Sequence, residues 1–153
     1  MKTKQITFHN KDGSTYQGTW KDGKEHGYGI SKDNGCTYEG DFVKGIPTDG
    51  IMEFDDGSMY GGGLDEKGEF HGTGIIIGED GTQLLGTFVN GEMHGVFKVT
   101  NEEGYYDLGE YKHNKRHSYW REKYPDGSEW DVQYEDGKIV ARSERKIELV
   151  PDK

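Results

Sequence analysis

Aromatic and polar residues alternate in short segments that recur along the chain at an almost constant spacing. The first segment, Tyr16–Trp20, reads YQGTW, and five later segments take the same place: YEGDF, YGGGL, LLGTF, DLGEY and WDVQY. Their central positions are spaced by 22, 22, 24, 23 and 23 residues. A period of two is typical of a β-strand with one buried face, and the constant spacing indicates an internal repeat.

Two sets of turn signals separate these segments. One set, which begins with Asp22-Gly23, follows each segment, and the other, which begins with Asp12-Gly13, falls between repeats. Asp-Gly and Asn-Gly are strong hairpin signals because both residues accept positive φ. Turns this frequent leave room only for short strands, so the pattern predicts about two antiparallel strands per repeat.

The chain is therefore expected to be all-β, an elongated single-layer antiparallel meander of about six hairpin repeats and about 13 strands. The repeat array is expected over residues 1–137, and residues 138–153 are expected to form a capping strand or tail, with a short helix as the alternative. The first strand is expected at 4–9, and repeats start near 14, 36, 58, 82, 105 and 128. The expected strands are 4–9, 14–20, 28–33, 36–42, 51–55, 58–64, 73–78, 82–88, 95–100, 105–111, 118–124, 128–134 and 138–148.

The large residues of each segment should share one face of the sheet, because side chains alternate along a strand. A glycine between two of them leaves a hollow in which a neighbouring ring can lie. This predicts an aromatic ladder as the core of a protein with few aliphatic residues. Its expected members are Tyr16, Trp20, Tyr38, Phe42, Tyr60, Leu64, Phe88, Tyr111 and Tyr134.

Composition narrows the classes of protein. Mean hydropathy is -1.00, but aromatic residues make up 12% of the chain, which argues against disorder. The longest aliphatic run, Ile75–Ile77, is far too short for a membrane helix, and the first residues lack the apolar stretch of a secretory signal. We therefore expect a cytoplasmic protein, with a peripheral position at a membrane or the cytoskeleton as an alternative. One cysteine, Cys36, excludes an internal disulfide.

Charge is unevenly distributed around a net of -10, which disfavours nucleic acid as a partner. Residues 49–110 hold 14 acids against two bases, whereas residues 112–123 hold five bases against one acid. The acids predict a face for a protein partner with a basic surface: Asp55, Asp65, Glu66 and Glu69. The basic band predicts a site for anionic lipid or another anion: Lys112, His113, Lys115, Arg116, His117, Trp120, Arg121 and Lys123. The competing interpretation of this band pairs its charges with acids on adjacent strands, such as Glu110, Glu129 and Asp131.

No catalytic residue, metal site or cofactor is predicted. The histidines His71, His94 and His117 recur every 23 residues, so they should lie about 9.5 Å apart, two strands at a time. Zinc ligands must lie much closer to one another. Paired acids such as Asp55-Asp56 fall in turns, where solvated carboxylates are expected, and Cys36 has no identifiable partner base.

The repeated sequence motifs resemble the MORN repeat (membrane occupation and recognition nexus). Repeat one shows the whole pattern, with Tyr16, Gly18 and Trp20 followed by His26, Gly27 and Gly29. Repeat two departs from it, with Thr48, Asp49 and Ile51 in place of the histidine and both glycines, and repeat five reads HSYW at 117–120. The last two repeats also resemble the YwqK-type antitoxin-like variant and the MORN module of a SET-domain lysine methyltransferase.

The resemblance implies a non-enzymatic scaffold or protein-interaction module. The alternative is a peripheral membrane tether that binds anionic phospholipid through the 112–123 band, and a second alternative is an antitoxin-like, toxin-neutralising protein. An open meander also leaves two edge strands, so self-association through the sheet edges is a further expectation.

Overall fold

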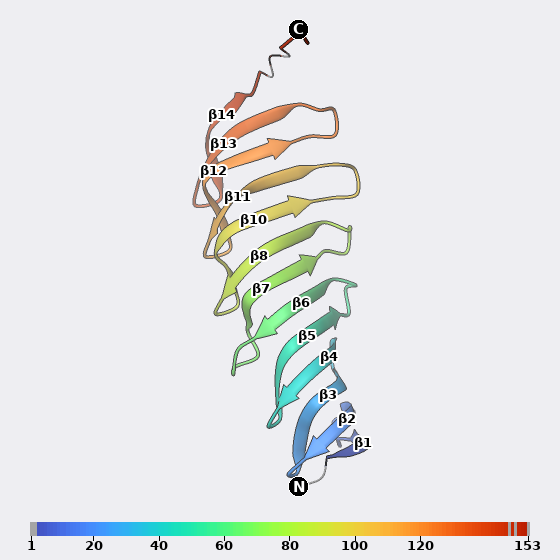
Figure 1. Ribbon diagram of the computed structural model, residues 1–153. Helices are drawn as coiled ribbons and strands as arrows, with labels where there is room; N and C mark the ends of the chain where they lie inside the picture. The colour runs from blue at the N-terminus through green and yellow to red at the C-terminus, as the bar shows by residue number, and fades with distance from the viewer. Residues whose placement is uncertain (1–2, 147, 149, 153) are drawn as a thin grey trace.

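The computed structural model describes residues 3–146, 148 and 150–152. The strands form one open antiparallel sheet whose order follows the chain, with β9 off the path beside β8. Figure 1 shows them stacked in a single layer, with the two chain ends at opposite ends of the ribbon. The expected all-β meander is confirmed, and the described residues form 14 strands in place of about 13. The strands are β1 (Lys4–His9), β2 (Thr15–Lys21), β3 (Lys24–Asp33), β4 (Cys36–Val43), β5 (Ile46–Phe54), β6 (Met59–Leu64), β7 (Phe70–Ile77), β8 (Gln83–Val89), β9 (Glu92–Met93), β10 (Gly95–Thr100), β11 (Tyr106–Lys112), β12 (Lys115–Lys123), β13 (Glu129–Glu135) and β14 (Lys138–Glu144).

The second strand of several hairpins begins earlier than its sequence predicts. Strands β3, β5, β7 and β12 start within two residues of the turn, whereas the expected starts were 28, 51, 73 and 118. Each of these strands shows a register shift against the strand before it, just after the central position of the repeat. A β-bulge there absorbs the extra residues without ending the pairing, so the glycine-rich stretch after each turn belongs to the strand.

The two glycines of the H-G-x-G motif have different physical roles. The first glycine adopts a left-handed backbone, with φ of 76° at Gly27, 77° at Gly72 and 88° at Gly95. In repeat five Ser118 takes this place and still has φ of 62°. The bend is therefore kept in HSYW at the cost of a conformation that serine rarely adopts.

The second glycine belongs to a row of glycines that crosses seven neighbouring strands, which we call the glycine row. A Cβ on Gly74 would lie 2.7 Å from the ring of Tyr60, so only glycine lets the ring lie flat against the backbone. The Tyr60 hydroxyl donates a hydrogen bond to Gly63 O at 2.7 Å, and the same bond recurs in repeats one and two. Repeat two, which was expected to lack this glycine, supplies Gly50 because its bulge is one residue shorter: two residues separate Pro47 from Gly50, whereas three separate Glu25 from Gly29 in repeat one. The row consists of Gly18, Gly29, Gly40, Gly50, Gly62, Gly74 and Gly86.

The aromatic ladder lies on the face that carries the glycine row, which we call the aromatic face. Seven of the nine expected core residues are buried, and their rings meet edge to face, as in Tyr60 and Phe88 at 5.4 Å. Trp20 and Tyr134 are only half-buried. Trp20 lies close to the open N-terminal end of the sheet and stacks on Phe8 of the edge strand β1.

In the C-terminal repeats, large side chains occupy positions that hold glycine in the earlier repeats. Phe97, Trp120 and Val132 continue the line of the glycine row, and each is at most 1% exposed. None of them was expected in the core. Trp120 covers Gly109 and donates a hydrogen bond from Nε1 to Glu110 O at 3.0 Å, so it replaces a tyrosine of the earlier repeats.

The last strand is an open edge. Every residue of β14 is exposed, and β14 pairs on one side only, with β13. Residues 147, 149 and 153 of the expected tail 138–153, and residues 1–2 of the expected array, lie outside the described residues.

Candidate functional site

The face opposite the aromatic face carries a line of exposed or half-buried aliphatic side chains. Cross-strand pairing places these side chains on one line, with Glu39 between Ile30 and Ile51, and Gly61 between Ile51 and Ile75. Leu85 follows Ile75 directly, and Lys98 lies between Leu85 and Leu108. We call this face the exposed face and its aliphatic members the apolar row: Ile30, Ile51, Ile75, Leu85 and Leu108.

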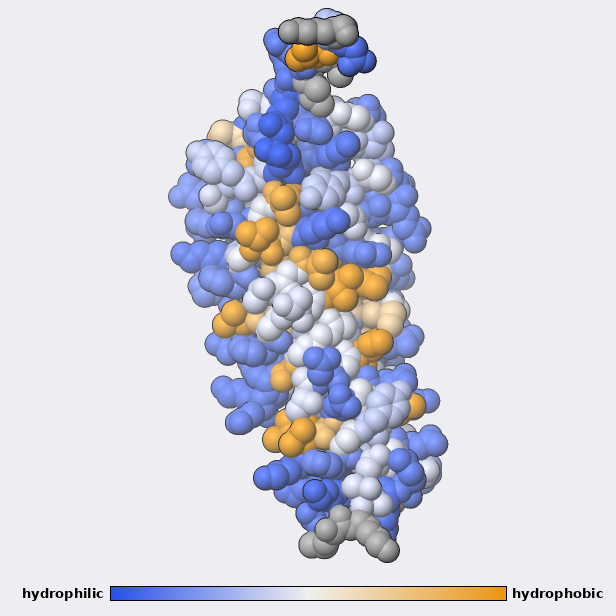
Figure 2. Space-filling view, viewed as in Figure 1, coloured by the Kyte–Doolittle hydropathy of each residue, from blue (hydrophilic) through white to orange (hydrophobic). Residues whose placement is uncertain are grey.

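Apolar residues gather along the long axis of the molecule in Figure 2, with hydrophilic residues on both sides. Ile51 is 49% exposed and Leu85 is 45% exposed, although both lie in the middle of strands. Tyr28, Val96 and Tyr119 on the same face are more exposed still. An alignment of exposed apolar side chains, here interrupted by Glu39, Gly61 and Lys98, marks an interaction surface more often than isolated exposed residues do.

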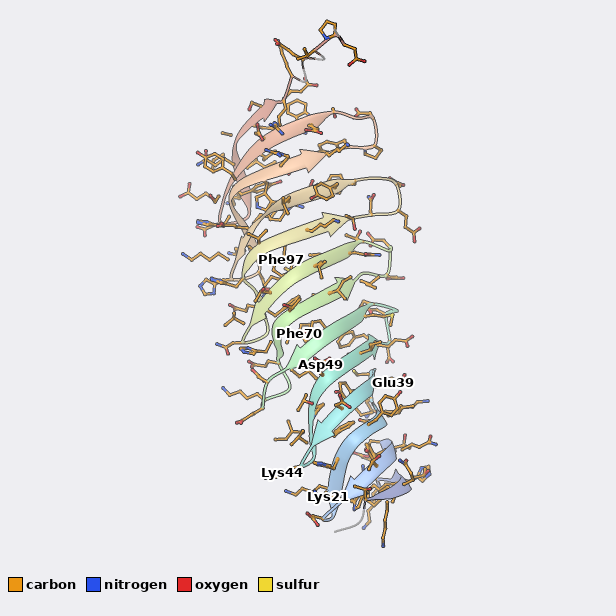
Figure 3. The ribbon with its side chains drawn as sticks, viewed as in Figure 1. Lys21, Glu39, Lys44, Asp49, Phe70 and Phe97 are labelled. Atoms are coloured by element: carbon orange, nitrogen blue, oxygen red, sulfur yellow. The ribbon has the colours of Figure 1, made fainter. Side chains whose placement is uncertain are left out.

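Acidic residues flank the N-terminal half of the apolar row. Glu39 on β4 and Asp49 on β5 (Figure 3) belong to the exposed face, and Asp41 lies directly opposite Asp49 across the two strands. The Tyr28 hydroxyl donates a hydrogen bond to Glu39. Like charges directly opposite each other destabilise a sheet, so this part of the exposed face favours a cationic group.

The predicted acidic face does not exist as one surface. Asp55 lies in the turn between β5 and β6, whereas Asp65, Glu66 and Glu69 lie in the turn between β6 and β7. In a meander, successive turns fall on opposite edges of the sheet. The prediction was wrong because it grouped the four acids by their closeness in the sequence. The sheet separates Asp55 from the other three by the length of a strand. Asp65 Oδ1 also accepts hydrogen bonds from the backbone of Lys67 and Glu69, so it stabilises its own turn.

The two long edges of the sheet differ in charge. The turns between repeats hold nine acids and one base, a net of -8, within residues 10–14, 33–35, 55–58, 78–82, 101–105 and 124–128. The hairpin turns on the other edge hold seven acids and seven bases, a net of zero, within residues 21–24, 43–46, 65–69, 89–92, 112–115 and 135–138. Of the 14 acids in residues 49–110, six lie in the turns between repeats, four in the hairpin turns and four within strands, so the acidic stretch of the sequence is divided between both edges and the strands.

Part of the basic band converges on one pocket. A cavity of about 450 Å³ opens beside the β11–β12 turn, and it faces Asp136 of the next hairpin turn. His113 also pairs with Glu92 of the preceding repeat, at 2.8 Å between Nδ1 and Oε2. We call this cavity the basic pocket; the band residues that line it are Lys112, His113, Lys115, Arg116 and His117.

The other three residues of the band lie elsewhere. Trp120 is 1% exposed in the core and is not available to a lipid, which corrects its assignment to the band. Arg121 lies on the exposed face between Leu108 and Asp131, and Lys123 lines a separate hollow with it. Alternation along β12 explains the separation, because Trp120 and its neighbour Arg121 point to opposite faces.

A pocket of the same kind recurs at the β2–β3 turn. It measures about 260 Å³ and is lined by Lys21, Lys24, His26 and Asp22, with Lys44 from the next hairpin turn. These residues occupy the places of Lys112, Lys115, His117, His113 and Asp136 in the repeat. The cavity is thus a property of the repeat, and its charge depends on the turn residues.

Arg116 has a second set of contacts, inside the core. Its Nη1 lies 2.7 Å from Asp107 Oδ2 and 3.1 Å from Glu122 Oε1, and both acids are almost completely buried. Tyr134 donates a hydrogen bond to Glu122 at 2.6 Å. We call Asp107, Arg116 and Glu122 the buried ionic cluster. The partners that the competing interpretation gave to the band, Glu110, Glu129 and Asp131, are not those of Arg116.

Asp107 is the strained member of this cluster. Burial raises the pKa of its carboxyl, and the hydrogen bond from Tyr105 and the charge of Arg116 offset this only in part. Its Oδ1 is buried and has no hydrogen-bond partner among the residues that the structure describes. Two carboxylates share one guanidinium, so the cluster carries an excess negative charge when both are ionised.

The described part of the chain shows neither a cluster of three or more His, Cys, Asp or Glu side chains that could hold a metal ion nor a helix able to cross a membrane. Cys36 is half-buried, and burial raises the pKa of its thiol. A raised thiol pKa disfavours the nucleophilic thiolate.

Comparison with known families agrees with the repeat geometry. The family model of the MORN repeat matches residues 16–37, 66–83, 85–96 and 108–129. No curated protein matches the chain. Four matches, on hairpins of one antiparallel sheet, show that the chain belongs to the MORN-repeat family.

Proposed function

We propose that this protein is a non-enzymatic scaffold that binds a protein partner along its exposed face, in the cytoplasm. The observation that carries the proposal is the apolar row. It leaves aliphatic side chains in contact with solvent, although the protein has few aliphatic residues. Ile51 and Leu85 are each about half exposed, so each forgoes roughly half of the ~1.5–3 kcal/mol that full burial of such a side chain contributes. A partner that covers the row recovers this energy.

The charge around the row favours a partner with a basic surface. Glu39, Asp41 and Asp49 surround Ile51, and the ion pairs of the described residues do not include them. Complementary charge mainly sets specificity and the rate of association, while the aliphatic side chains supply affinity.

Site-specific photo-crosslinking tests the proposal. A photoreactive amino acid is placed at Ile51 or at Leu85, and the matched control places it at Asn34, an exposed turn residue. We expect a protein adduct from extract of the source organism at both row positions and not at residue 34. Equal adducts at all three positions, or none at the row, would contradict the proposal.

A second candidate function is the binding of anionic phospholipid at the basic pocket. Its support is the convergence of Lys112, Lys115 and His117, with Arg116, on one cavity at a hairpin edge. Acids such as Glu66 and Glu92 on the same edge would repel an anionic bilayer, so contact is limited to the end of the ribbon. The toxin-neutralising alternative stays a prediction from the sequence.

Vesicle co-sedimentation tests the second candidate. Binding to phosphoinositide vesicles, but not to neutral ones, should be strong at low salt and weak near physiological salt. The double variant Lys112→Gln/Lys115→Gln should remain in the supernatant, whereas the control Arg121→Gln, on the exposed face, should pellet like the wild type. Pelleting of all three proteins alike would reject the pocket as the lipid site.

A further inference from the structure

The first three members of the apolar row are regularly spaced along the ribbon, and Leu85 follows one strand after Ile75. Ile30, Ile51 and Ile75 lie on β3, β5 and β7, every second strand of the sheet. Neighbouring strands are about 4.8 Å apart, so these side chains recur at about 9.6 Å. From β3 to β11 the row spans seven strand spacings, or about 34 Å.

This spacing matches one face of an α-helix that crosses the strands. Seven residues of a helix rise about 10.5 Å, within about 1 Å of the interval that separates Ile30, Ile51 and Ile75. Residues at heptad spacing also stay on one side of the helix. A helix of about 22 residues would cover the whole row at 1.5 Å per residue.

An extended segment fits the exposed face less well. The backbone groups in the middle of the sheet already pair with neighbouring strands, so a strand laid across them would gain no ladder hydrogen bonds. A helix satisfies its own backbone groups. A helix can therefore bind through side-chain contacts alone, and side chains are what the exposed face presents.

Charge distinguishes the two ends of such a helix. The end of the row on β3–β5 is flanked by Glu39, Asp41 and Asp49, whereas the end on β8–β12 carries Lys98 and Arg121 together with acids. The like-charged pair of Asp41 and Asp49 is relieved by a cation placed between them. Basic residues are therefore favoured at one end of the helix only.

We propose that the exposed face binds an amphipathic helix of about 22 residues, with aliphatic residues at heptad spacing and its basic residues over β3–β5. This inference rests on the proposed scaffold function and specifies the partner class. The bound helix lies along the ribbon, with its apolar face on the apolar row.

A synthetic peptide tests the geometry without knowledge of the natural partner. The probe is a fluorescent 22-residue peptide with Leu at the a and d positions of three heptads, Lys elsewhere in the first heptad, and Gln and Glu elsewhere. One control peptide has the same composition in scrambled order, and another has Gln in place of the Lys residues. Binding is measured by fluorescence anisotropy, with the 153-residue chain as it stands.

We expect the probe to bind at least tenfold more tightly than the scrambled peptide. The protein variant Ile51→Glu/Leu85→Glu should bind the probe at least tenfold more weakly. Both side chains are exposed, so the variant should keep the wild-type circular dichroism spectrum. The matched control Val140→Glu, on exposed β14 and outside the row, should bind like the wild type. Replacing the Lys residues by Gln should weaken binding, and Asp41→Asn/Asp49→Asn should abolish the difference between the Lys peptide and the Gln peptide.

Equal binding of probe and scrambled peptide, or equal binding by wild type and the Ile51→Glu/Leu85→Glu variant, would overturn the helix proposal. Photo-crosslinks at Ile51 and Leu85 together with no probe binding would show that the scaffold function holds and that the partner is not such a helix. Failure of the crosslinks as well would remove the proposed function itself.

Discussion

Arg116 Nη1 lies 2.7 Å from Asp107 Oδ2 in the core of repeat five, where Asp107 takes the place that tyrosine holds in the first three repeats. Burial of two carboxylates is tolerated because this one guanidinium contacts both. Arg116 also lies over the ring of Trp120, with Cζ 4.2 Å from the ring centroid. The last two repeats therefore depend on an ionic contact where the first repeats depend on rings.

Replacement of Arg116 by methionine should destabilise the C-terminal repeats by about 3–5 kcal/mol, because it leaves Asp107 and Glu122 without their cation. Urea unfolding monitored by tryptophan fluorescence measures the loss. The control Arg121→Met removes a cation from the exposed face of the same strand, and its cost should stay within about 0.5 kcal/mol. Similar costs for both variants would mean that the cluster contributes no more than a surface charge.

The pH dependence of stability should carry the signature of Asp107. Its pKa in the folded protein is raised by burial above the ordinary 3.8, so the native state binds the proton more tightly than the unfolded state does. The contribution of this group to the unfolding free energy is therefore present at acidic pH and is lost as pH rises through the folded pKa. The isosteric variant Asp107→Asn should lack this loss.

The measurement is the difference in unfolding free energy between wild type and Asp107→Asn from pH 4 to pH 8. The difference isolates Asp107 from turn aspartates such as Asp56 and Asp80. Hydrogen bonds from Ser58 and Thr82 lower the pKa values of these two carboxyls. Their contribution to the unfolding free energy therefore increases as pH rises, opposite to that of Asp107. Wild type should lose stability relative to the variant as pH rises. A difference that is flat, or that grows in favour of wild type, would contradict the strained ionisation of Asp107.

The glycine row makes a prediction about backbone packing. Gly74→Ala should cost about 1–3 kcal/mol, because its Cβ would lie 2.7 Å from the Tyr60 ring, and that ring is fully buried. Gly61→Ala, on the other face of the neighbouring strand, places its Cβ 3.4 Å from a methyl group of Ile75 and should be nearly neutral. Thermal unfolding of both variants checks this, and equal melting temperatures would contradict the role of the row.

The sequence predicted the repeat, the single-layer meander and most of the N-terminal core, because each of these depends on short-range pattern. It did not predict Phe97 and Trp120 as core residues, because they stand where earlier repeats have glycine. It also did not predict Asp107 as buried, since an acid in an alternating strand is normally solvated. A signal was present: Asp107 aligns with Tyr16 in the repeat.

The apolar row was not predicted because its members come from five different strands. Only the register of the sheet shows that Ile51 and Ile75 lie on one line, with Gly61 between them. The recurrence of isoleucine directly after the second glycine, at Ile30, Ile51 and Ile75, is the trace of this row in the sequence. The basic band was predicted as one site because its residues are contiguous, and alternation along β12 divides it.

The open edge β14 predicts how two copies would associate. The continuous path of the sheet holds 13 strands, so β1 and β14 run in the same direction. With the aromatic faces on the same side, antiparallel pairing of two copies must therefore join β14 to β14 or β1 to β1, and a β14–β1 contact would be parallel. Ile139 and Val140 are both more than half exposed on β14, so a two-fold β14–β14 pair buries them.

Sedimentation equilibrium over a range of concentrations checks this association. Val140→Lys should weaken a β14–β14 dimer roughly tenfold, because the two-fold axis repeats each new like-charge contact in the pair. The control Val96→Lys places the same charge on the exposed face, away from both edges, and should leave the dimer unchanged. Dimerisation that weakens with Val96→Lys and not with Val140→Lys would place the contact on the exposed face, and a wild-type chain that stays monomeric at all concentrations would show that the exposed edge does not pair.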